Sequence, residues 1–567
     1  MIPRLLTALL LLPAVSSSQR IESLRTYQVQ YQEFAAALDG RSALPLKCGL
    51  YYTTGFERAK PDLSPELLQK MQHAFQRPQH LTEFYVSPGG HFRIHYTLQG
   101  EDAVDPTSTN NAGVPDYVFE AARAAERSYR LLVDSLGFRP HLDDNGTHGP
   151  EYDIYILDLG NVYGWTYSEN QVSENPARYN TYMEVDNDYI GNYFTKGIDA
   201  LRVTVAHEYF HAIQFAYAYR ASDIFFFEMS ATWFEDLAYD DVNDYLQYLP
   251  NFFRKLDRPL HLRDNWHEYG ASLWLKYWLQ DRDYRSLRRI WEMMTDRPAL
   301  LAIRDEVENQ GILFPDALAE FYSWCLYTNA RYVPGQYFEE GDLYPEITIP
   351  PYRQITVQKD TALVDSSRAL TAVFYQVATD PSKDFSAILT SELNSQWRIL
   401  AAAESLNGQL GRTLSRQGPV PVTMREFENE GKIYLAAVNA RMPDDPEMKA
   451  VFLPQNPFEI SISLKELGSY VGVLLPPQPN PFIADGEQTV SFLFNLEQTA
   501  PVRITIVSER GREVFTRQID LKPRGLNQFV WDGKSNDGQI VSSGIYVVIL
   551  KSGEGESGLQ KLAVIRR

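Results

Sequence analysis

The sequence predicts an α+β protein in which a domain of mixed helices and strands is followed by two all-β domains. Three observations support this fold class. Helical periodicity dominates residues 81–335, interrupted by a few apolar strand-like runs. After residue 340 prolines cluster, and short apolar runs replace the helical pattern. From residue 476 onward such runs alternate with glycine-containing turn signals, which is typical of a small β-sandwich.

Length, composition and charge limit the classes of protein that fit the chain. Its 567 residues suggest about three or four domains. A hydrophobic fraction of 44% with 22% charged residues is typical of folded globular protein rather than of disorder. The formal net charge of −20 argues against nucleic acid or an anionic membrane as a partner.

The N-terminus has the pattern of a signal peptide over residues 1–18. Arg4 supplies a positive charge, and the apolar run Leu5–Val15 is too short to span a bilayer. Small residues after it suit a cleavage site, although a short anchor helix is an alternative. No later stretch reaches about 18 apolar residues, so we expect no transmembrane segment in the mature chain. The protein is therefore expected to be secreted, extracellular or on the cell surface.

Residues 19–80 predict a mainly helical leader or propeptide. Within it, Ser64 and Pro65 form a good helix start, because the hydroxyl caps the helix and proline fits its first position.

The chemistry of the chain centres on Val203–Gln214, which contains the pattern H-E-x-x-H. On a helix His207 and His211 lie one turn apart on one face, so both imidazoles can bind one metal ion. Neutral imidazole suits zinc, and zinc lowers the pKa of a bound water to about 7. Glu208 is placed to act as general base on that water while the water attacks a polarised carbonyl.

A third ligand is expected on a second helix downstream. Glu228 follows His211 with sixteen residues between them, enough for the chain to turn and bring another helix alongside. Two histidines and one glutamate, with water in the fourth position, make an open catalytic zinc site. Glu235 shares a helical face with Glu228 and is a rival for the same role.

H-E-x-x-H followed by a helix carrying E-x-x-A resembles the gluzincin metallopeptidases. The resemblance implies a zincin-like metallopeptidase domain over residues 81–335, with His207, His211 and Glu228 as zinc ligands and Glu208 as general base. Familiar gluzincins place the third ligand slightly further along, which leaves Glu235 as a ligand or as the partner that orients a histidine. The implied activity is a secreted zinc-dependent endopeptidase acting on a protein or peptide substrate.

Two other functions are compatible with the same residues. One is a zinc hydrolase that acts on a non-peptide bond. The other is a surface adhesion or binding protein with a vestigial zinc site, in which the β-domains carry the function.

The two cysteines, Cys48 and Cys325, have two alternative roles. In a secreted chain with two cysteines, a disulfide between them is the favoured prediction. Alternatively, the segment Pro45–Gly49 loosely resembles the cysteine-switch peptide of zinc protease propeptides, in which a thiolate fills the open zinc position.

Gluzincin-like enzymes often stabilise the oxyanion with a Tyr or His from the lobe after the zinc helices, so the resemblance implies such a donor here. Tyr269, His261 and His267 are candidates, and no motif chooses among them. Thr181–Val185 is predicted to be an edge strand before the zinc helix, and the resemblance to gluzincins implies that such an edge pairs with the substrate backbone.

Two further stretches carry polar side chains that resemble metal ligands. Asp105–Asp116 is rich in Asp and Asn and could hold calcium, although an ordinary turn before the helix Tyr117–Leu136 is favoured. His91 and His95 lie in the strand-like run Phe84–Tyr96. Residues four apart on a strand are about 13 Å apart, so we expect both histidines to be structural or on the surface.

The C-terminal half predicts two β-domains. Residues 345–468 contain short apolar runs typical of a β-sandwich, and Pro476–Phe482 is predicted to be a stiff linker. The motifs P-N-P-F, W-D-G, N-D-G and S-G-I-Y within residues 476–567 together resemble a type IX secretion sorting domain with an FlgD-like immunoglobulin fold. That resemblance implies export across the outer membrane, with the secretion machinery as a partner.

Overall fold

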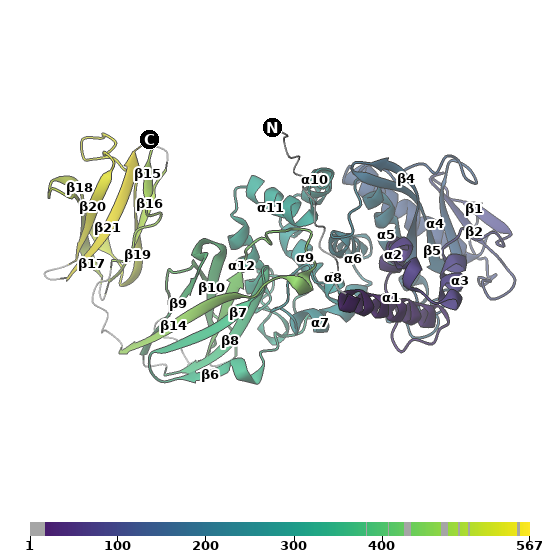
Figure 1. Ribbon diagram of the computed structural model, residues 1–567, viewed down its shortest axis with the longest axis horizontal. Coiled ribbons are helices and arrows are strands. Elements are labelled where there is room, and N and C mark those ends of the chain that lie inside the picture. Colours follow the sequence, from purple (N-terminus) through teal and green to yellow (C-terminus); the bar gives the residue numbers. More distant parts are fainter. Residues whose placement is uncertain are drawn as a thin grey trace, which may run out of the picture. The chain divides into compact units, whose positions relative to one another are not determined.

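The computed structural model describes residues 17–380, 383–405, 408–424, 432–466, 474–485, 488–496, 499–552 and 556–566. It divides into two compact units (Figure 1). Unit 1 comprises residues 1–348, 369–371 and 442–454, and unit 2 comprises the remainder. Most of the predicted signal peptide lies outside the described residues. Within the part of the chain that the structure describes, no helix is both long and apolar enough to cross a membrane.

Unit 1 is built on a five-stranded mixed sheet in the order β1-β2-β3-β5-β4. Strands β2, β3 and β5 run parallel, whereas β1 and β4 pair antiparallel at the two edges. The strands are β1 (Glu83–Val86), β2 (Phe92–Tyr96), β3 (Tyr152–Leu157), β4 (Gly164–Glu174) and β5 (Ala177–Asp186).

Helices α4 and α5 pack together and against the sheet, α4 on β2 and α5 on β4 and β5. Helix α6 packs on α5, and a set of shorter helices completes the unit. These helices are α4 (Asp116–Tyr129), continued by the π-helix η2 (Arg130–Ser135), α5 (Gly197–Phe215), α6 (Ile224–Ala238), α7 (Leu249–Phe253), α8 (His267–Gly270), α9 (Leu273–Leu279), α10 (Arg285–Met293), α11 (Ala299–Asn309) and α12 (Phe314–Trp324).

The predicted leader forms three helices that share a hydrophobic core with the sheet. Phe34 of α1 stacks on Tyr52 of α2 at 4.3 Å between ring centroids and meets Trp165 of β4 at 5.8 Å. As predicted, the third helix begins at Ser64 and Pro65, and the Ser64 hydroxyl accepts a hydrogen bond from the Leu67 N–H at 3.3 Å. The helices are α1 (Ser17–Leu38), α2 (Leu50–Ala59) and α3 (Pro65–Ala74).

Two strand predictions were wrong. The run Phe84–Tyr96 is a hairpin, because a turn at Ser87–Gly90 divides it into β1 and β2. Thr181–Val185 is not an edge strand: β5 lies between β3 and β4, since β4 folds back antiparallel onto it. The edge strand next to helix α5, which carries H-E-x-x-H, is therefore β4. Sequence periodicity identifies a strand but not its position in the sheet.

The loop Asp105–Asp116, for which calcium binding and an ordinary turn were the alternatives, is arranged as a turn before α4. The Asp116 carboxylate accepts hydrogen bonds from the N–H groups of Thr109 and Asn110 and from both of their side chains. These donors occupy the oxygens and hold the loop against the start of the helix.

Unit 2 contains a two-sheet sandwich followed by a C-terminal β-domain. The sandwich sheets have the orders β11-β10-β13-β8-β6 and β12-β9-β14-β7, around a core that includes Trp397. The strands are β6 (Gln354–Val357), β7 (Thr361–Ser367), β8 (Thr371–Thr379), β9 (Lys383–Ser391), β10 (Trp397–Ala403), β11 (Leu414–Gln417), β12 (Val422–Met424), β13 (Lys432–Asn439) and β14 (Asn456–Glu466).

The C-terminal domain has its own core, which includes Leu474 and Trp531, between sheets ordered β15-β21-β20-β17-β18 and β16-β19. The strands are β15 (Phe482–Ala484), β16 (Val490–Leu496), β17 (Ala500–Ser508), β18 (Glu513–Lys522), β19 (Gly525–Trp531), β20 (Gly544–Ser552) and β21 (Glu556–Arg566).

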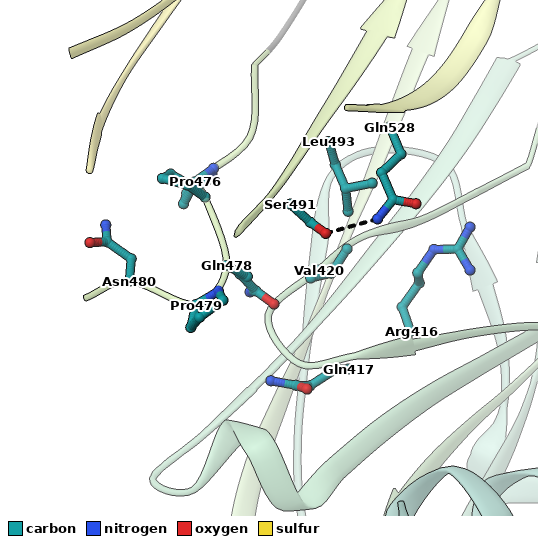
Figure 2. A pocket seen from close by; sticks show the side chains of 11 residues that line it. Arg416, Gln417, Val420, Pro476, Gln478, Pro479, Asn480, Ser491, Leu493 and Gln528 are labelled. Carbon is teal, nitrogen blue, oxygen red and sulfur yellow. Dashed lines mark hydrogen bonds between the residues drawn. The ribbon is translucent and has the colours of Figure 1, made fainter. Parts of the chain in front are cut away.

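The predicted linker Pro476–Phe482 is part of the C-terminal domain instead. The backbones of Gln478 and Ser491 exchange two hydrogen bonds, at 3.0 and 2.7 Å, and Figure 2 shows this stretch beside Ser491 and Leu493. Proline has no N–H to donate, and the N–H of Gln478, between Pro477 and Pro479, pairs this stretch with β16. The pocket drawn there has one charged lining residue, Arg416, and no carboxylate, histidine or cysteine in its lining.

The shared core makes a prediction about the leader. Phe34→Ala should lower the free energy of unfolding of the full chain by about 3–5 kcal/mol, because it leaves a cavity between α1, α2 and β4. Val29→Ala on the exposed side of α1 should change it by less than about 0.5 kcal/mol. Urea denaturation measures both, and equal small effects would mean that the leader does not pack as described.

Candidate metal centre

The H-E-x-x-H pattern lies on α5, a helix that is buried on every side. All of its residues from Val203 to Phe215 are buried, because the sheet, α4 and α6 surround it. His207 and His211 project from one face, with ring centroids 4.6 Å apart. Burial of the whole helix fixes both imidazoles and keeps bulk water away from them.

Helix α6 brings Glu228 to the same place. Its Oε2 lies 3.1 Å from His207 Nε2 and 3.6 Å from His211 Nε2. Cys48, from the loop before α2, places its Sγ 3.5 Å from His211 Nε2. One ligand atom from each of these four side chains lies within 4.8 Å of all the others.

The chemistry of these four side chains fits zinc. Two imidazole nitrogens, a carboxylate and a thiol are the donor types that zinc prefers, and four is its usual coordination number. Burial opposes a charge on His207, yet hydrogen bonds to Glu228 and Glu235 raise its pKa to about 10. Burial likewise opposes a charge on Glu228, yet the two histidines lower its pKa to about 2. The cluster therefore stabilises a positive charge in a dry interior, as a cation site must.

Glu235 lies on the other side of the His207 ring. Its Oε1 is 2.6 Å from His207 Nδ1, and its Oε2 forms an ion pair with Lys47 Nζ at 2.7 Å. Lys47 also pairs with Asp244, in the short helix η3 (Asp244–Tyr248), at 2.5 Å. A carboxylate on Nδ1 fixes the orientation of the ring and leaves Nε2 free to bind a metal. Of the two rival glutamates, Glu228 lies in the cluster and Glu235 lies behind it.

His211 is held in a similar way by Gln214, which sequence analysis did not assign to the site. The Gln214 side-chain oxygen is 2.7 Å from His211 Nδ1, and its amide donates to the Phe227 carbonyl and the Ser230 hydroxyl of α6. The three-residue spacing from His211 was a signal for this contact, because such residues are neighbours on a helix.

The predicted general base, Glu208, lies beside the cluster. Its Oε2 accepts a hydrogen bond from the Thr166 hydroxyl of β4 at 2.8 Å. Burial raises the pKa of Glu208, and burial followed by the charges of Glu208 and Glu228 raises that of the Cys48 thiol. Nothing in the local sequence pointed to Thr166, because β4 reaches α5 only through the fold.

The close approach of β4 to α5 requires glycine at position 164. A Cβ there would lie 2.8 Å from Thr204 Cγ2 and 3.3 Å from Glu208 Cγ. Any larger residue would move the edge strand away from the helix.

The structure distinguishes the three oxyanion candidates by position. The Tyr269 ring lies 6.4 Å from the His207 ring, and Tyr269 and Glu228 line one cleft of about 760 Å³. His261 lines the same cleft, next to Phe225, whereas His267 packs against Phe252.

The predicted disulfide was wrong: Cys48 and Cys325 are both buried and free. Cys48 lies in the metal-competent cluster, whereas the Cys325 thiol donates to the Phe321 carbonyl one turn earlier in the chain. The count of two cysteines could not reveal that they belong to different parts of unit 1.

A second cluster consists of His95, His148 and Asp153. His95 Nε2 lies 2.7 Å from Asp153 Oδ1, and the Arg77 guanidinium forms an ion pair with the same carboxylate. Arg77 already supplies a positive charge to Asp153, which favours a structural role for His95. The His91 ring stacks on Tyr129 at 3.8 Å between ring centroids.

Two family models match parts of the chain. The FlgD Ig-like domain matches residues 480–556, and a family of unknown function, DUF6055, matches residues 91–302. The C-terminal domain is thus an FlgD-like Ig domain. The second match contains His207, Glu208, His211 and Glu228 but not Cys48.

Comparison with solved structures gives partial overlaps. FlgD from P. aeruginosa is 21% identical over 17% of this chain and 68% of its own, with a TM-score of 0.13. PorZ, a bacterial surface component of the type IX secretion system of Porphyromonas gingivalis, is 22% identical over 19% of this chain and 14% of its own, with a TM-score of 0.13. Latent PorU from the same organism is 13% identical over 38% of this chain and 19% of its own, with a TM-score of 0.16. No curated protein matches the chain.

The different positions of the two glutamates give a direct test. Glu228→Ala should purify nearly free of zinc, because it removes an atom of the cluster itself. Glu235→Ala should keep most of its zinc and lose about 10–100-fold in metal affinity, because it removes a group that orients His207. Elemental analysis of the two purified variants decides the matter, and the reverse pattern of zinc contents would exchange their roles.

Proposed function

We propose that the chain is a secreted or cell-surface zinc-dependent endopeptidase. The observation that supports it best is the convergence of His207 Nε2, His211 Nε2 and Glu228 Oε2 beside the Glu208 carboxylate in the buried interior. Three protein ligands of this type with an adjacent carboxylate are the requirements of a hydrolytic zinc site.

In this proposal His207, His211 and Glu228 hold the ion. A zinc ion held there would supply the Lewis acidity that activates a substrate carbonyl and water. Glu208 would accept a proton from the attacking water and later deliver it to the leaving amine. Thr166 keeps the Glu208 carboxylate oriented by its 2.8 Å hydrogen bond, and burial raises the pKa of Glu208.

The remaining positions have supporting roles. Tyr269 lies on the cleft side of His207, where a phenol O–H can donate to a carbonyl oxygen that gains negative charge. Strand β4 forms the edge of the sheet next to the centre, which is where an extended peptide pairs by backbone hydrogen bonds.

A zinc hydrolase for another bond would use the same ligands, and an adhesion protein would not need Glu208. Zymography on casein or gelatin with and without a chelator separates these possibilities. Chelator-sensitive clearing of the protein substrate supports the endopeptidase.

Glu208 provides the sharpest test of the reaction. Glu208→Gln should retain about one zinc per chain and lose several orders of magnitude in kcat, because the amide cannot accept the proton. Glu292→Gln, at an exposed site on α10, is the matched control and should leave both properties unchanged. Full activity in zinc-loaded Glu208→Gln would exclude this role of Glu208.

We also propose that the C-terminal Ig-like domain directs export by a type IX secretion system. The match to the FlgD Ig-like domain supports this, together with the separate core that begins at Leu474. In this proposal the domain is recognised by the secretion machinery and takes no part in catalysis.

Deleting residues 474–567 should leave chelator-sensitive proteolysis intact and retain the protein in the periplasm. The converse fusion, a periplasmic reporter carrying residues 474–567, should reach the cell surface or the medium. Cell fractionation with immunoblotting measures both. Normal export of the truncated chain would contradict the sorting role.

A further inference from the structure

We propose that Cys48 is the fourth ligand of the metal centre and that the segment Leu46–Gly49 is an inhibitory latch on it. This inference rests on the proposed zinc endopeptidase function, whose regulation it describes. In the unprocessed chain the thiolate of Cys48 would take the position that a hydrolytic site must leave open to water.

The latch occupies the edge of the sheet as well as the metal centre. The Leu46 N–H donates to the Asn161 carbonyl at 2.9 Å, and the Leu46 carbonyl accepts from the Tyr163 N–H at 3.0 Å. The Gly49 N–H then donates to the Gly164 carbonyl, the first residue of β4, at 2.9 Å. These backbone groups lie just before β4 and at its first residue, where the edge strand to which an extended substrate would pair begins.

Between these two anchors the chain points Cys48 into the cluster. Its Sγ is 3.5 Å from His211 Nε2 and accepts a hydrogen bond from the Leu50 N–H, at the start of α2, at 3.3 Å. Cys48, His207, His211 and Glu228 are each less than 5% exposed. A thiolate here completes a closed set of four ligands, which has no position for water.

Lys47 anchors the latch on the opposite side of His207. Its ammonium group is buried between Glu235 and Asp244, and Glu235 in turn holds His207 Nδ1. Two consecutive residues of the latch thus reach the centre. Cys48 contacts the proposed ligand His211, and Lys47 contacts Glu235, the carboxylate that orients the proposed ligand His207. Removing a fully buried Lys47 from its two carboxylates would leave both without their cation, so the loop is firmly held.

Glycine at position 49 allows the latch to lie this close to the sheet. A Cβ there would come within 2.8 Å of Trp165 Cβ. The leader also forms one wall of the cleft at the centre: Tyr31, Tyr51 and Arg58 line it together with Glu228 and Tyr269. The leader therefore occupies both the metal centre and its approach.

Latching and release are acid–base steps without oxidation or reduction. When the latch closes, the Cys48 S–H bond breaks, the proton passes to solvent and a sulfur–metal bond forms. Release reverses this exchange: water replaces the sulfur, and the thiol regains a proton. Proteolytic removal or displacement of the leader would make release permanent.

The test uses the full chain and begins with spectroscopy rather than activity. X-ray absorption of the zinc-loaded wild type should show one sulfur scatterer at about 2.3 Å. The cobalt-substituted wild type should show a thiolate-to-cobalt charge-transfer band. Cys48→Ser should lose the band, and Cys325→Ser, a matched buried control, should keep it.

Hydrolysis of labelled casein by the same unprocessed proteins completes the test. Cys48→Ser should be active, whereas the wild type and Cys325→Ser should be latent until the leader is cleaved.

A zinc-loaded wild type without a sulfur scatterer overturns the latch and leaves the proposed function standing. A sulfur scatterer with no gain of activity in folded Cys48→Ser also overturns it. A wild type that binds no zinc contradicts the proposed function itself. The X-ray measurement needs no variant, so a misfolded Cys48→Ser does not prevent a decision.

Discussion

The His207 imidazole between two carboxylates is the interaction on which the candidate centre depends. Glu228 approaches Nε2 at 3.1 Å and Glu235 approaches Nδ1 at 2.6 Å, both in the interior. Two buried carboxylates are costly unless positive charge compensates them. Lys47 supplies that positive charge to Glu235. A metal ion held by the cluster of His207, His211, Glu228 and Cys48 would supply it to Glu228. Charge balance thus links the leader, α5 and α6 into one site.

The surrounding fold serves to keep this arrangement dry and rigid. Helix α5 is enclosed by the sheet, α4 and α6, so its histidines have little freedom to rotate. Gln214 ties His211 to α6, and Thr166 ties Glu208 to the edge strand. Ligands fixed by neighbours in this way need little reorganisation when they bind an ion, which is the usual benefit of preorganisation.

The leader belongs physically to the domain that it covers. Its three helices bury aromatic side chains against the sheet, and its loop adds backbone hydrogen bonds to the sheet edge. Removing it would expose a large apolar surface around Trp165. Through this packing the rest of unit 1 stabilises the leader. Its removal is therefore expected to require cleavage or a large displacement rather than a small fluctuation.

The sequence by itself determined the elements whose signals are local. Helical spacing placed His207 and His211 on one face and identified the helix that carries Glu228, and turn signals identified the C-terminal β-domain, which the FlgD Ig-like match confirms. Tertiary structure decided what depends on distant contacts. It put β4 rather than β5 at the edge, paired Pro476–Phe482 with its domain, and separated the two cysteines. It also placed Glu235 behind His207 and brought Lys47 and Cys48 to the cluster. The physical reason is that helix periodicity is set by neighbours three or four residues apart, whereas strand order arises from pairings between strands tens of residues apart. Lys47 and Cys48 reach the cluster across 188 and 163 residues of sequence.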